Sequence, residues 1–94
     1  PWAPGAHPLE KKRIGCEGKA SVVQLRFEPG FADPQWCSRS HVLIVLEGEL
    51  AVEFRDHVVW VGAGDALKVD AGTEHRAKNH GKTPTVLFAV SDLP

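Results

Sequence analysis

The stretch from Pro34 to Leu50, PQWCSRSHVLIVLEGEL, constrains the fold of this chain more than any other. In an extended strand the side chains alternate between two faces, so we expect Gln35, Cys37 and His41 to share one face. Apolar residues occupy both faces after the histidine: Val42, Leu43, Ile44, Val45 and Leu46. Such a run is typical of a strand that is covered on both sides, as in a small barrel or sandwich. Gly48 then provides the permissive backbone that a tight turn needs.

The remainder of the chain reads as short apolar segments separated by turns. We expect strands over residues 20–27, 50–54, 58–61, 66–69, 73–79 and 85–90. The 9 glycines and 7 prolines are spread along the chain rather than clustered, which fits many short strands. No segment shows the 3.6-residue apolar period of a helix. The pattern therefore predicts an all-β fold, an antiparallel sandwich or barrel.

Length and charge limit the classes of function. A chain of 94 residues forms one domain at most. A net charge of -1 gives no electrostatic reason to bind nucleic acid or an anionic membrane, so we expect neither partner. No run approaches the roughly 18 apolar residues of a membrane span. We expect residues 1–12 to form an N-terminal arm, either loose or lying on a neighbouring subunit with Trp2 as its anchor, and residues 13–94 to form the barrel domain.

The N-terminus and the cysteines bear on the compartment. Pro1 to Pro8 lacks the basic-then-apolar order of a signal peptide. Two cysteines are too few for a disulfide scaffold. We therefore expect a cytoplasmic protein with reduced thiols, although the sequence leaves open a disulfide between Cys16 and Cys37.

The segment from Gly64 to Asn79 carries the most specific pattern in the chain. It reads glycine, five residues, Asp70-Ala71-Gly72, two residues, His75, three residues and Asn79. This pattern resembles the second motif of the cupin superfamily, in which a proline stands where this chain has Asp70. The resemblance covers about residues 20–90 and implies a cupin barrel, an antiparallel double-stranded β-helix or jelly roll. It also implies a cavity at one end of the barrel, where a metal can bind.

The first cupin motif resembles this chain in spacing but not in residue type. Counting back from Gly48 places His41 at the acidic position of that motif, Cys37 at its second histidine and Gln35 at its first. The sequence DPQWC before His41 is similar to a subgroup of small single-domain cupins with an Asp-His-Trp-Cys style motif. Gln35, or the proline before it in another alignment, departs from that subgroup and leaves the number of ligands open.

These residues predict a metal site with sulfur and nitrogen ligands: Cys37 and His41 from one strand, and His75 from a strand across the barrel. A thiolate and two imidazoles suit a transition metal at about 2.0–2.3 Å, and three protein ligands leave a position open, as in catalytic sites. Gln35 would add a carbonyl oxygen, or water would take its place. Sulfur favours zinc, copper or iron, with nickel and manganese as further divalent candidates. Because the thiol must lose its proton, affinity should fall at low pH.

Each of these residues also has a structural interpretation. Cys37 alone is most often a small buried hydrophobic residue, and His41 alone a hydrogen-bonded interior histidine. Asn79 shares a face with His75, and we expect it to lie in the cavity or to form a hydrogen bond near it. We expect Trp36, on the face opposite Cys37, and Trp60 to be packing residues, and four side chains to be solvated: His57, Arg76, Lys78 and His80.

Three classes of function remain open. The first is a metal-dependent enzyme acting on a small organic molecule; dioxygenation, isomerisation and decarboxylation all occur in cupins, and nothing in the chain selects among them. The alternative is a non-catalytic small-molecule binding or sensor module, which the absence of an acidic ligand favours. The third is a structural domain. We also expect a homodimer, formed by the Val22–Val23 region and the N-terminal arm through added strands at a sheet edge.

Overall fold

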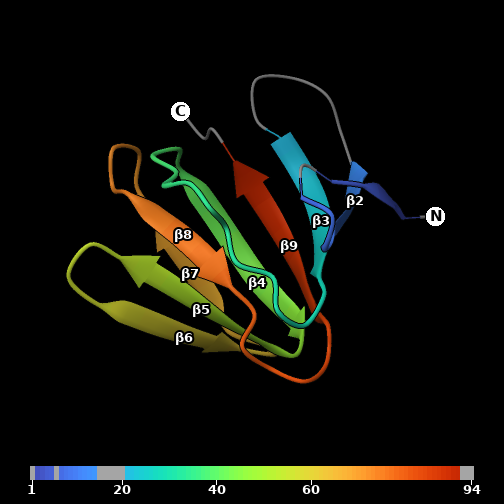
Figure 1. Cartoon of the computed structure of the whole chain (residues 1–94). Helices are drawn as coiled ribbons and strands as arrows, with labels where there is room; N and C mark the ends of the chain where they lie inside the picture. Colours follow the sequence, from blue (N-terminus) through green and yellow to red (C-terminus); the bar gives the residue numbers. More distant parts are fainter. Residues whose placement is uncertain (1, 6, 15–20, 92–94) are drawn as a thin grey trace.

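The computed structural model of this chain describes residues 2–5, 7–14 and 21–91, and every regular element in these ranges is a β-strand (Figure 1). The strands are β1 (Ala3–Pro4), β2 (Glu10–Ile14), β3 (Ser21–Phe27), β4 (His41–Glu47), β5 (Glu49–Phe54), β6 (Val58–Gly62), β7 (Ala66–Val69), β8 (His75–Lys78) and β9 (Thr85–Ser91). The all-β prediction is confirmed. None of the described segments is a helix long and apolar enough to cross a membrane.

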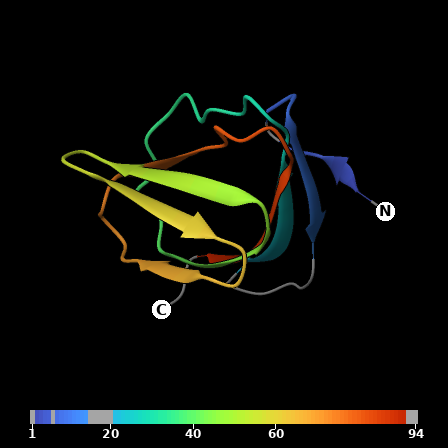
Figure 2. The same ribbon diagram turned by 90° about the horizontal axis from the view of Figure 1, so that it is seen from below.

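The strands form two antiparallel sheets on opposite sides of a common interior. The larger sheet has the order β1-β2-β3-β9-β4-β7 and the smaller one β6-β5-β8. The central strands of the larger sheet come from distant parts of the chain, because β9 pairs with both β3 and β4. Figure 2 shows the sheets curving around the interior that they share. This non-sequential pairing closes the chain into a barrel.

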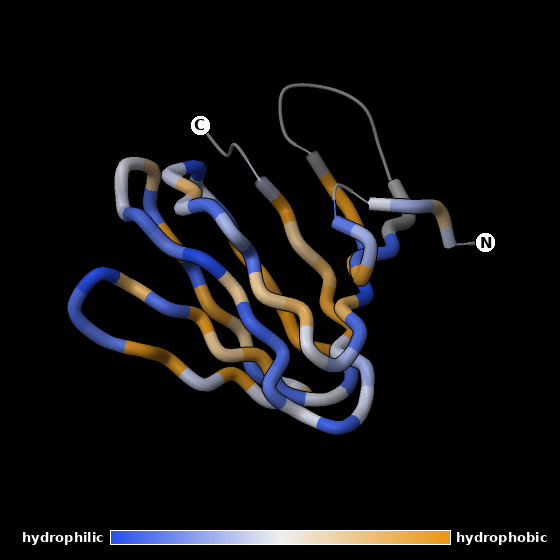
Figure 3. The backbone as a smooth tube through the Cα atoms, viewed as in Figure 1, coloured by the Kyte–Doolittle hydropathy of each residue, from blue (hydrophilic) through white to orange (hydrophobic). Residues whose placement is uncertain are grey.

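Alternation along the strands builds the core. Val45 of β4 and Leu50 and Val52 of β5 face inward, with exposed fractions of 0%, 1% and 1%. The rings of Phe27 and Phe31 stack with their centroids 4.1 Å apart. Apolar residues lie mainly along the strands and polar residues mainly at the turns (Figure 3). Removing these apolar side chains from water stabilises the fold by about 25 cal/mol for each Å² buried.

The outer face of β4 differs from the prediction. The sequence predicted cover on both sides of this strand, but Ile44 and Leu46 are 38% and 45% exposed. Phe88, directly opposite Ile44 on β9, is 37% exposed. The prediction is wrong because the smaller sheet covers only the inner face of the larger one, so the apolar residues of the outer face remain in contact with solvent in the single chain.

The N-terminal strands occupy the sheet edge that the sequence assigned to a dimer contact. β2 pairs with β3 and β1 pairs with β2, so Val22 and Val23 lie in an interior strand. An edge contact through this pair is therefore wrong, because a strand of the same chain already takes that edge. β2 also crosses the expected boundary between residues 12 and 13. The homodimer itself stays a prediction, and Cys16, whose disulfide with Cys37 the sequence left open, lies outside the described residues.

Residues 32–40 form an irregular segment rather than the start of the predicted strand. Regular pairing begins only at His41, and before it the chain makes two isolated antiparallel bridges, Ala32 with Lys78 and Cys37 with His75. Pro34 has no backbone N–H and cannot continue a ladder of hydrogen bonds. The segment therefore runs beside β8 and pairs with it at two isolated bridges, one of which carries Cys37.

A charged cluster lies across the paired strands β5 and β8. Arg76 Nη2 is 2.6 Å and Lys78 Nζ 2.9 Å from the carboxylate of Glu53, and the side chains of both basic residues are half-buried rather than solvated as expected. Glu53 lies directly opposite Arg76 in the strand register. Hydrogen bonds from Lys78 and Arg76 hold the pKa of Glu53 below its ordinary value. The cluster therefore favours the ionised form of Glu53 in the folded state.

The turn at Gly48 generates a prediction about stability. Gly48 has a φ of 77°, and a Cβ added there would lie 2.7 Å from the carbonyl oxygen of Pro84. Gly64 has a φ of 89°, but a Cβ there would meet nothing within 4 Å. We expect Gly64→Ala to cost about 1–2 kcal/mol through backbone strain alone, and Gly48→Ala roughly 3 kcal/mol or more because a backbone clash is added. Urea unfolding of both variants measures the difference, and equal losses would contradict the proposed clash.

The Glu53 cluster generates a prediction about pH. Because the pKa of Glu53 is lowered on folding, its contribution to the free energy of unfolding is complete above its unfolded value of 4.5 and is lost as pH falls through the lower folded value. We expect Glu53→Gln to destabilise the protein at about pH 7 and to differ much less from the wild type at about pH 3. Urea unfolding at both pH values measures this. Glu49→Gln, on the same strand, is the matched control, and a Glu53→Gln loss that is independent of pH would refute the explanation.

Candidate metal centre

The bridge between Cys37 and His75 joins two segments that are far apart in the sequence. The N–H of Cys37 donates to the carbonyl of His75 at 2.8 Å, and the N–H of His75 donates to the carbonyl of Cys37 at 2.9 Å. Two residues that exchange both hydrogen bonds face each other directly in an antiparallel pair, and their side chains project to the same side. The backbone therefore places the thiol and the imidazole next to each other on the inner side of the barrel.

His41 joins this pair from the first position of β4. On one side its Cα partner is Val69 of β7, and on the other it is Ser91, the last residue of β9. Cross-strand partners are close enough for their side chains to meet, and His41 Nδ1 lies 2.7 Å from Ser91 Oγ. His41 Nε2 then faces Cys37 Sγ at 3.4 Å. When Nδ1 donates its hydrogen to Ser91, Nε2 carries the lone pair on the side of the sulfur.

The tautomer of His75 follows from its hydrogen bond. His75 Nδ1 lies 2.8 Å from the carbonyl oxygen of Thr73, which can only accept, so Nδ1 carries the hydrogen. Nε2 is left with a lone pair. The residue is only 6% exposed, and Nε2 is buried without a hydrogen-bond partner among the described residues. A buried acceptor in this state is costly unless something binds to it.

The donor atoms of Cys37, His41 and His75 fit a transition metal. All three lie within 4.8 Å of one another. Bonds of about 2.0–2.3 Å in a tetrahedral site separate ligand atoms by about 3.3–3.8 Å, a range that the Cys37–His41 contact already meets. The orientation of both imidazoles by hydrogen bonds at Nδ1 is also the usual arrangement of metal-bound histidines.

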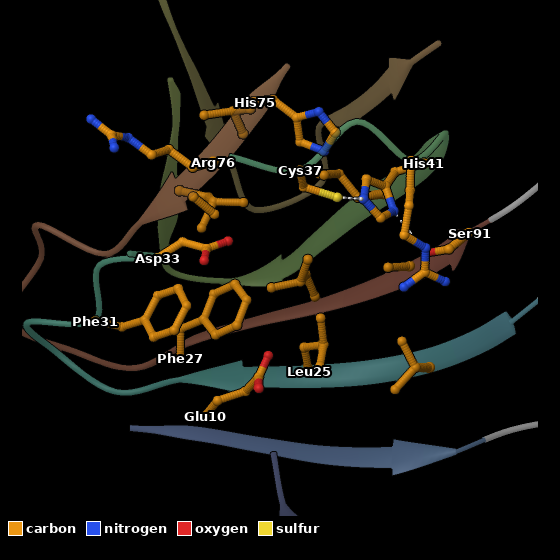
Figure 4. A pocket seen from close by; sticks show the side chains of 18 of the residues that line it. Glu10, Leu25, Phe27, Phe31, Asp33, Cys37, His41, His75, Arg76 and Ser91 are labelled. Carbon is orange, nitrogen blue, oxygen red and sulfur yellow. Dashed lines mark hydrogen bonds between the residues drawn. The ribbon is translucent and has the colours of Figure 1, made fainter. Parts of the chain in front are cut away.

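A cavity of about 670 Å³ lies in front of the three donors. Its wall is mainly apolar, with Leu25 and Phe27 among the lining residues. Cys37, His41 and His75 gather at one part of the cavity, while Phe27 and Phe31 lie in another (Figure 4). Seven further polar residues line it: His7, Glu10, Asp33, Gln35, Arg39, Arg76 and Ser91. A cavity of this size and composition suits a small organic molecule.

The other predicted site residues have separate positions. Gln35 lines the same cavity with an exposed side chain, and its role as a fourth ligand stays a prediction. Asn79 is not among the residues that line the cavity; it is buried, and its side chain binds the backbone at Phe27 O, Thr83 O and Gly81 N. It therefore fastens the turn after β8 to β3. The sequence did not predict this role. Sharing a face with His75 does not specify which backbone groups the Asn79 side chain can reach.

The predictions for the remaining aromatic and histidine residues are confirmed in part. His57 lies at the exposed β5–β6 turn beside Asp56, in agreement with its predicted solvation. Trp60 is 61% exposed, so its predicted packing role is wrong. Ser91 and Thr73, which orient the two imidazoles, were not predicted. For Ser91 a signal was present, since it continues the inward-facing series Thr85, Leu87 and Ala89 of β9.

A double-stranded β-helix with two imidazoles and a thiol at one part of an inner cavity defines the class of this protein. The chain belongs to the cupin domain family, whose sequence model matches residues 23–91. A comparison with curated proteins found no match.

Solved structures of cupins resemble the whole barrel. The cupin domain of an XRE family transcriptional regulator from Enterobacter cloacae is 13% identical, with a TM-score of 0.78, over 92% of this chain and 98% of the other. KdgF from a Halomonas species is 20% identical, with a TM-score of 0.79, over 100% and 87%. A predicted oxalate decarboxylase from Thermotoga maritima is 21% identical, with a TM-score of 0.79, over 90% and 81%. At such identities the likeness concerns the fold, and the predicted cupin barrel is confirmed.

Proposed function

We propose that this cupin holds one divalent transition metal through Cys37, His41 and His75 and is a metal-dependent enzyme acting on a small organic molecule in its cavity. The observation that carries the proposal is the buried, unpartnered Nε2 of His75, whose lone pair shares the cavity with a thiol and a second imidazole. An interior histidine with a purely structural role would use both ring nitrogens for hydrogen bonds, because an unmade buried bond is costly.

The donor set also supports a choice among metals. One sulfur and two nitrogens favour zinc, iron, copper or nickel over magnesium and calcium, which require oxygen ligands. Three protein donors leave at least one position open toward the cavity, as in catalytic rather than structural sites. When bound there, the metal would act as a Lewis acid toward an oxygen or nitrogen atom of the ligand.

The residues of the chain divide the remaining tasks between them. Ser91 and the Thr73 carbonyl hold the two imidazoles in the orientation that ligation needs. The apolar wall around Leu25 and Phe27 excludes water from the body of a bound molecule and sets its size. The substrate therefore combines a small apolar body with one polar group that can reach the metal.

A second candidate function is a binding or sensor module without turnover. The first motif of this chain differs from the usual cupin motif, because His41 stands where other cupins have an acidic ligand, and this difference favours the binding module. The similar structures include both a domain of a transcriptional regulator and a predicted oxalate decarboxylase. One result separates the two functions. An enzyme converts its substrate and loses that turnover in a folded His75→Ala variant, whereas a sensor binds its ligand without converting it.

Titration with cobalt(II) tests the metal site directly. We expect the wild type to bind about one equivalent and to show a near-ultraviolet absorption band from sulfur-to-cobalt charge transfer, because Cys37 supplies a thiolate. Cys37→Ser should lose that band, and His75→Ala should weaken binding by about 100-fold or more. His57→Ala, which removes an exposed histidine, is the matched control and should bind as the wild type does. Binding below about a tenth of an equivalent, or a band that survives in Cys37→Ser, would rule out the proposed ligand set.

The Ser91 hydroxyl gives a finer prediction. Ser91→Ala removes the partner of His41 Nδ1 and should lower cobalt(II) affinity about tenfold, in the range found for groups that orient metal ligands. Ser91→Thr keeps a hydroxyl at the same buried position and should retain most of the affinity. A competition titration against a chelator of known affinity measures both. Unchanged affinity in Ser91→Ala would show that this hydrogen bond does not contribute to ligation.

A further inference from the structure

The outer side of the Cys37–His75 bridge carries a second cluster, which no ligand role explains. Trp36 precedes Cys37, and Glu74 and Arg76 flank His75 in the sequence. Because side chains alternate along extended backbone, Trp36 and Glu74 project to the side opposite the donor atoms, whereas Arg76 also lines the cavity. Trp36 is half-buried and is not among the residues that line the cavity, which agrees with this arrangement.

Two guanidinium groups pack against the ring of Trp36. The Cζ atoms of Arg55 and Arg76 lie 4.0 and 4.2 Å from the ring centroid, well within the range of cation–π interactions. Neither arginine is held by the ring alone. Arg55 donates two hydrogen bonds to Glu74, both at 3.1 Å, and Arg76 donates from Nε to Glu53 at 2.8 Å. The ring therefore contacts two basic side chains that are themselves fixed to β5 and to the start of β8.

This cluster is placed where regular structure is weakest. The segment of residues 32–40 has no strand pairing except the two isolated bridges, so few backbone hydrogen bonds hold Cys37 against His75. A bridge of one residue pair opens easily unless side chains on either side close it. On the inner side Cys37 Sγ contacts His41 Nε2 at 3.4 Å, while His75 Nε2 has no hydrogen-bond partner among the described residues, so no side-chain hydrogen bond joins Cys37 to His75 there.

We infer that Trp36 is a positioning residue that, through Arg55 and Arg76, holds the Cys37 thiol in register with His75. The inference rests on the proposed metal site and deepens it: the outer cluster sets the distance between two of the three donors before any metal arrives. Preorganised ligands lose less conformational freedom on binding, so affinity depends on the ring even though the ring touches no donor atom.

The experiment compares Trp36→Leu, Trp36→Phe and Trp60→Leu in the full chain. Two readouts are measured: cobalt(II) affinity together with the sulfur-to-cobalt band, and amide hydrogen exchange of Cys37 and His75 in the metal-free protein. We expect Trp36→Leu to bind cobalt(II) about tenfold more weakly, with a reduced band, and to speed exchange at both bridge amides. Trp36→Phe keeps an aromatic face for the arginines and should recover most of both properties. Trp60→Leu removes an exposed ring elsewhere and should change neither.

The two readouts separate failure of the inference from failure of the proposed function. If the wild type binds cobalt(II) with the band and Trp36→Leu matches it in affinity, spectrum and exchange, the inference is overturned and the metal site stands. If the wild type shows no band, the proposed function fails, and exchange at the Cys37 and His75 amides still decides the positioning role. If Trp36→Leu does not fold, Arg55→Gln replaces it: Arg55 is largely exposed, and its loss should shift both readouts in the same direction.

Discussion

The pair of hydrogen bonds between the backbones of Cys37 and His75 is the constraint on which the rest of this site depends. It is one antiparallel pair in a segment without other regular pairing at that point. Nevertheless it fixes which side chains face the barrel interior on both segments. Side chains alternate along extended backbone, so the direction of one side chain determines the direction of its neighbours. A slip of one residue would turn Trp36 inward and the thiol outward, and the donor set would no longer exist.

The same alternation separates two kinds of chemistry across one layer of backbone. On the inner side lie the thiol of Cys37 and the imidazole of His75, whose lone pairs remain available for a metal only where few hydrogen-bond donors occupy them. On the outer side stand an indole, two guanidinium groups and their carboxylate partners. Of these groups Arg76 also lines the cavity, whereas Trp36, Arg55 and the two carboxylates are not among the lining residues. Hydrogen bonds from Arg55 hold the pKa of Glu74 low, so this outer cluster stays ionised at neutral pH.

Sequence reasoning was strongest where the backbone allows few alternatives. Gly64 and Gly72 adopt φ values of 89° and 88°, and the strands between such turns could be placed from their apolar alternation. The convergence of His41 with His75 followed from the spacing of the two cupin motifs. The irregular course of residues 32–40 did not follow, since a period of two looks the same in a strand and in an extended segment that touches its neighbour at isolated points. The exposed face of β4 was misjudged for a related reason: an apolar run cannot reveal whether the cover on its second side belongs to the same chain.

The buried Nε2 of His75, which has no hydrogen-bond partner among the described residues, is the feature on which the proposed metal site depends. In Asn79, an equally buried side chain a few residues away, the amide makes three hydrogen bonds to backbone groups and leaves little for a ligand to do. In His75 one nitrogen is bound to Thr73 and the other faces the cavity with no partner in the described part of the chain. Both residues belong to the same motif, His75 at the start of β8 and Asn79 directly after its end, yet Asn79 holds the turn while His75 Nε2 has no partner among the described residues. In the described part of the chain, the Asn79 amide is therefore satisfied by backbone groups, and His75 Nε2 is left without a partner beside a thiol and a second imidazole.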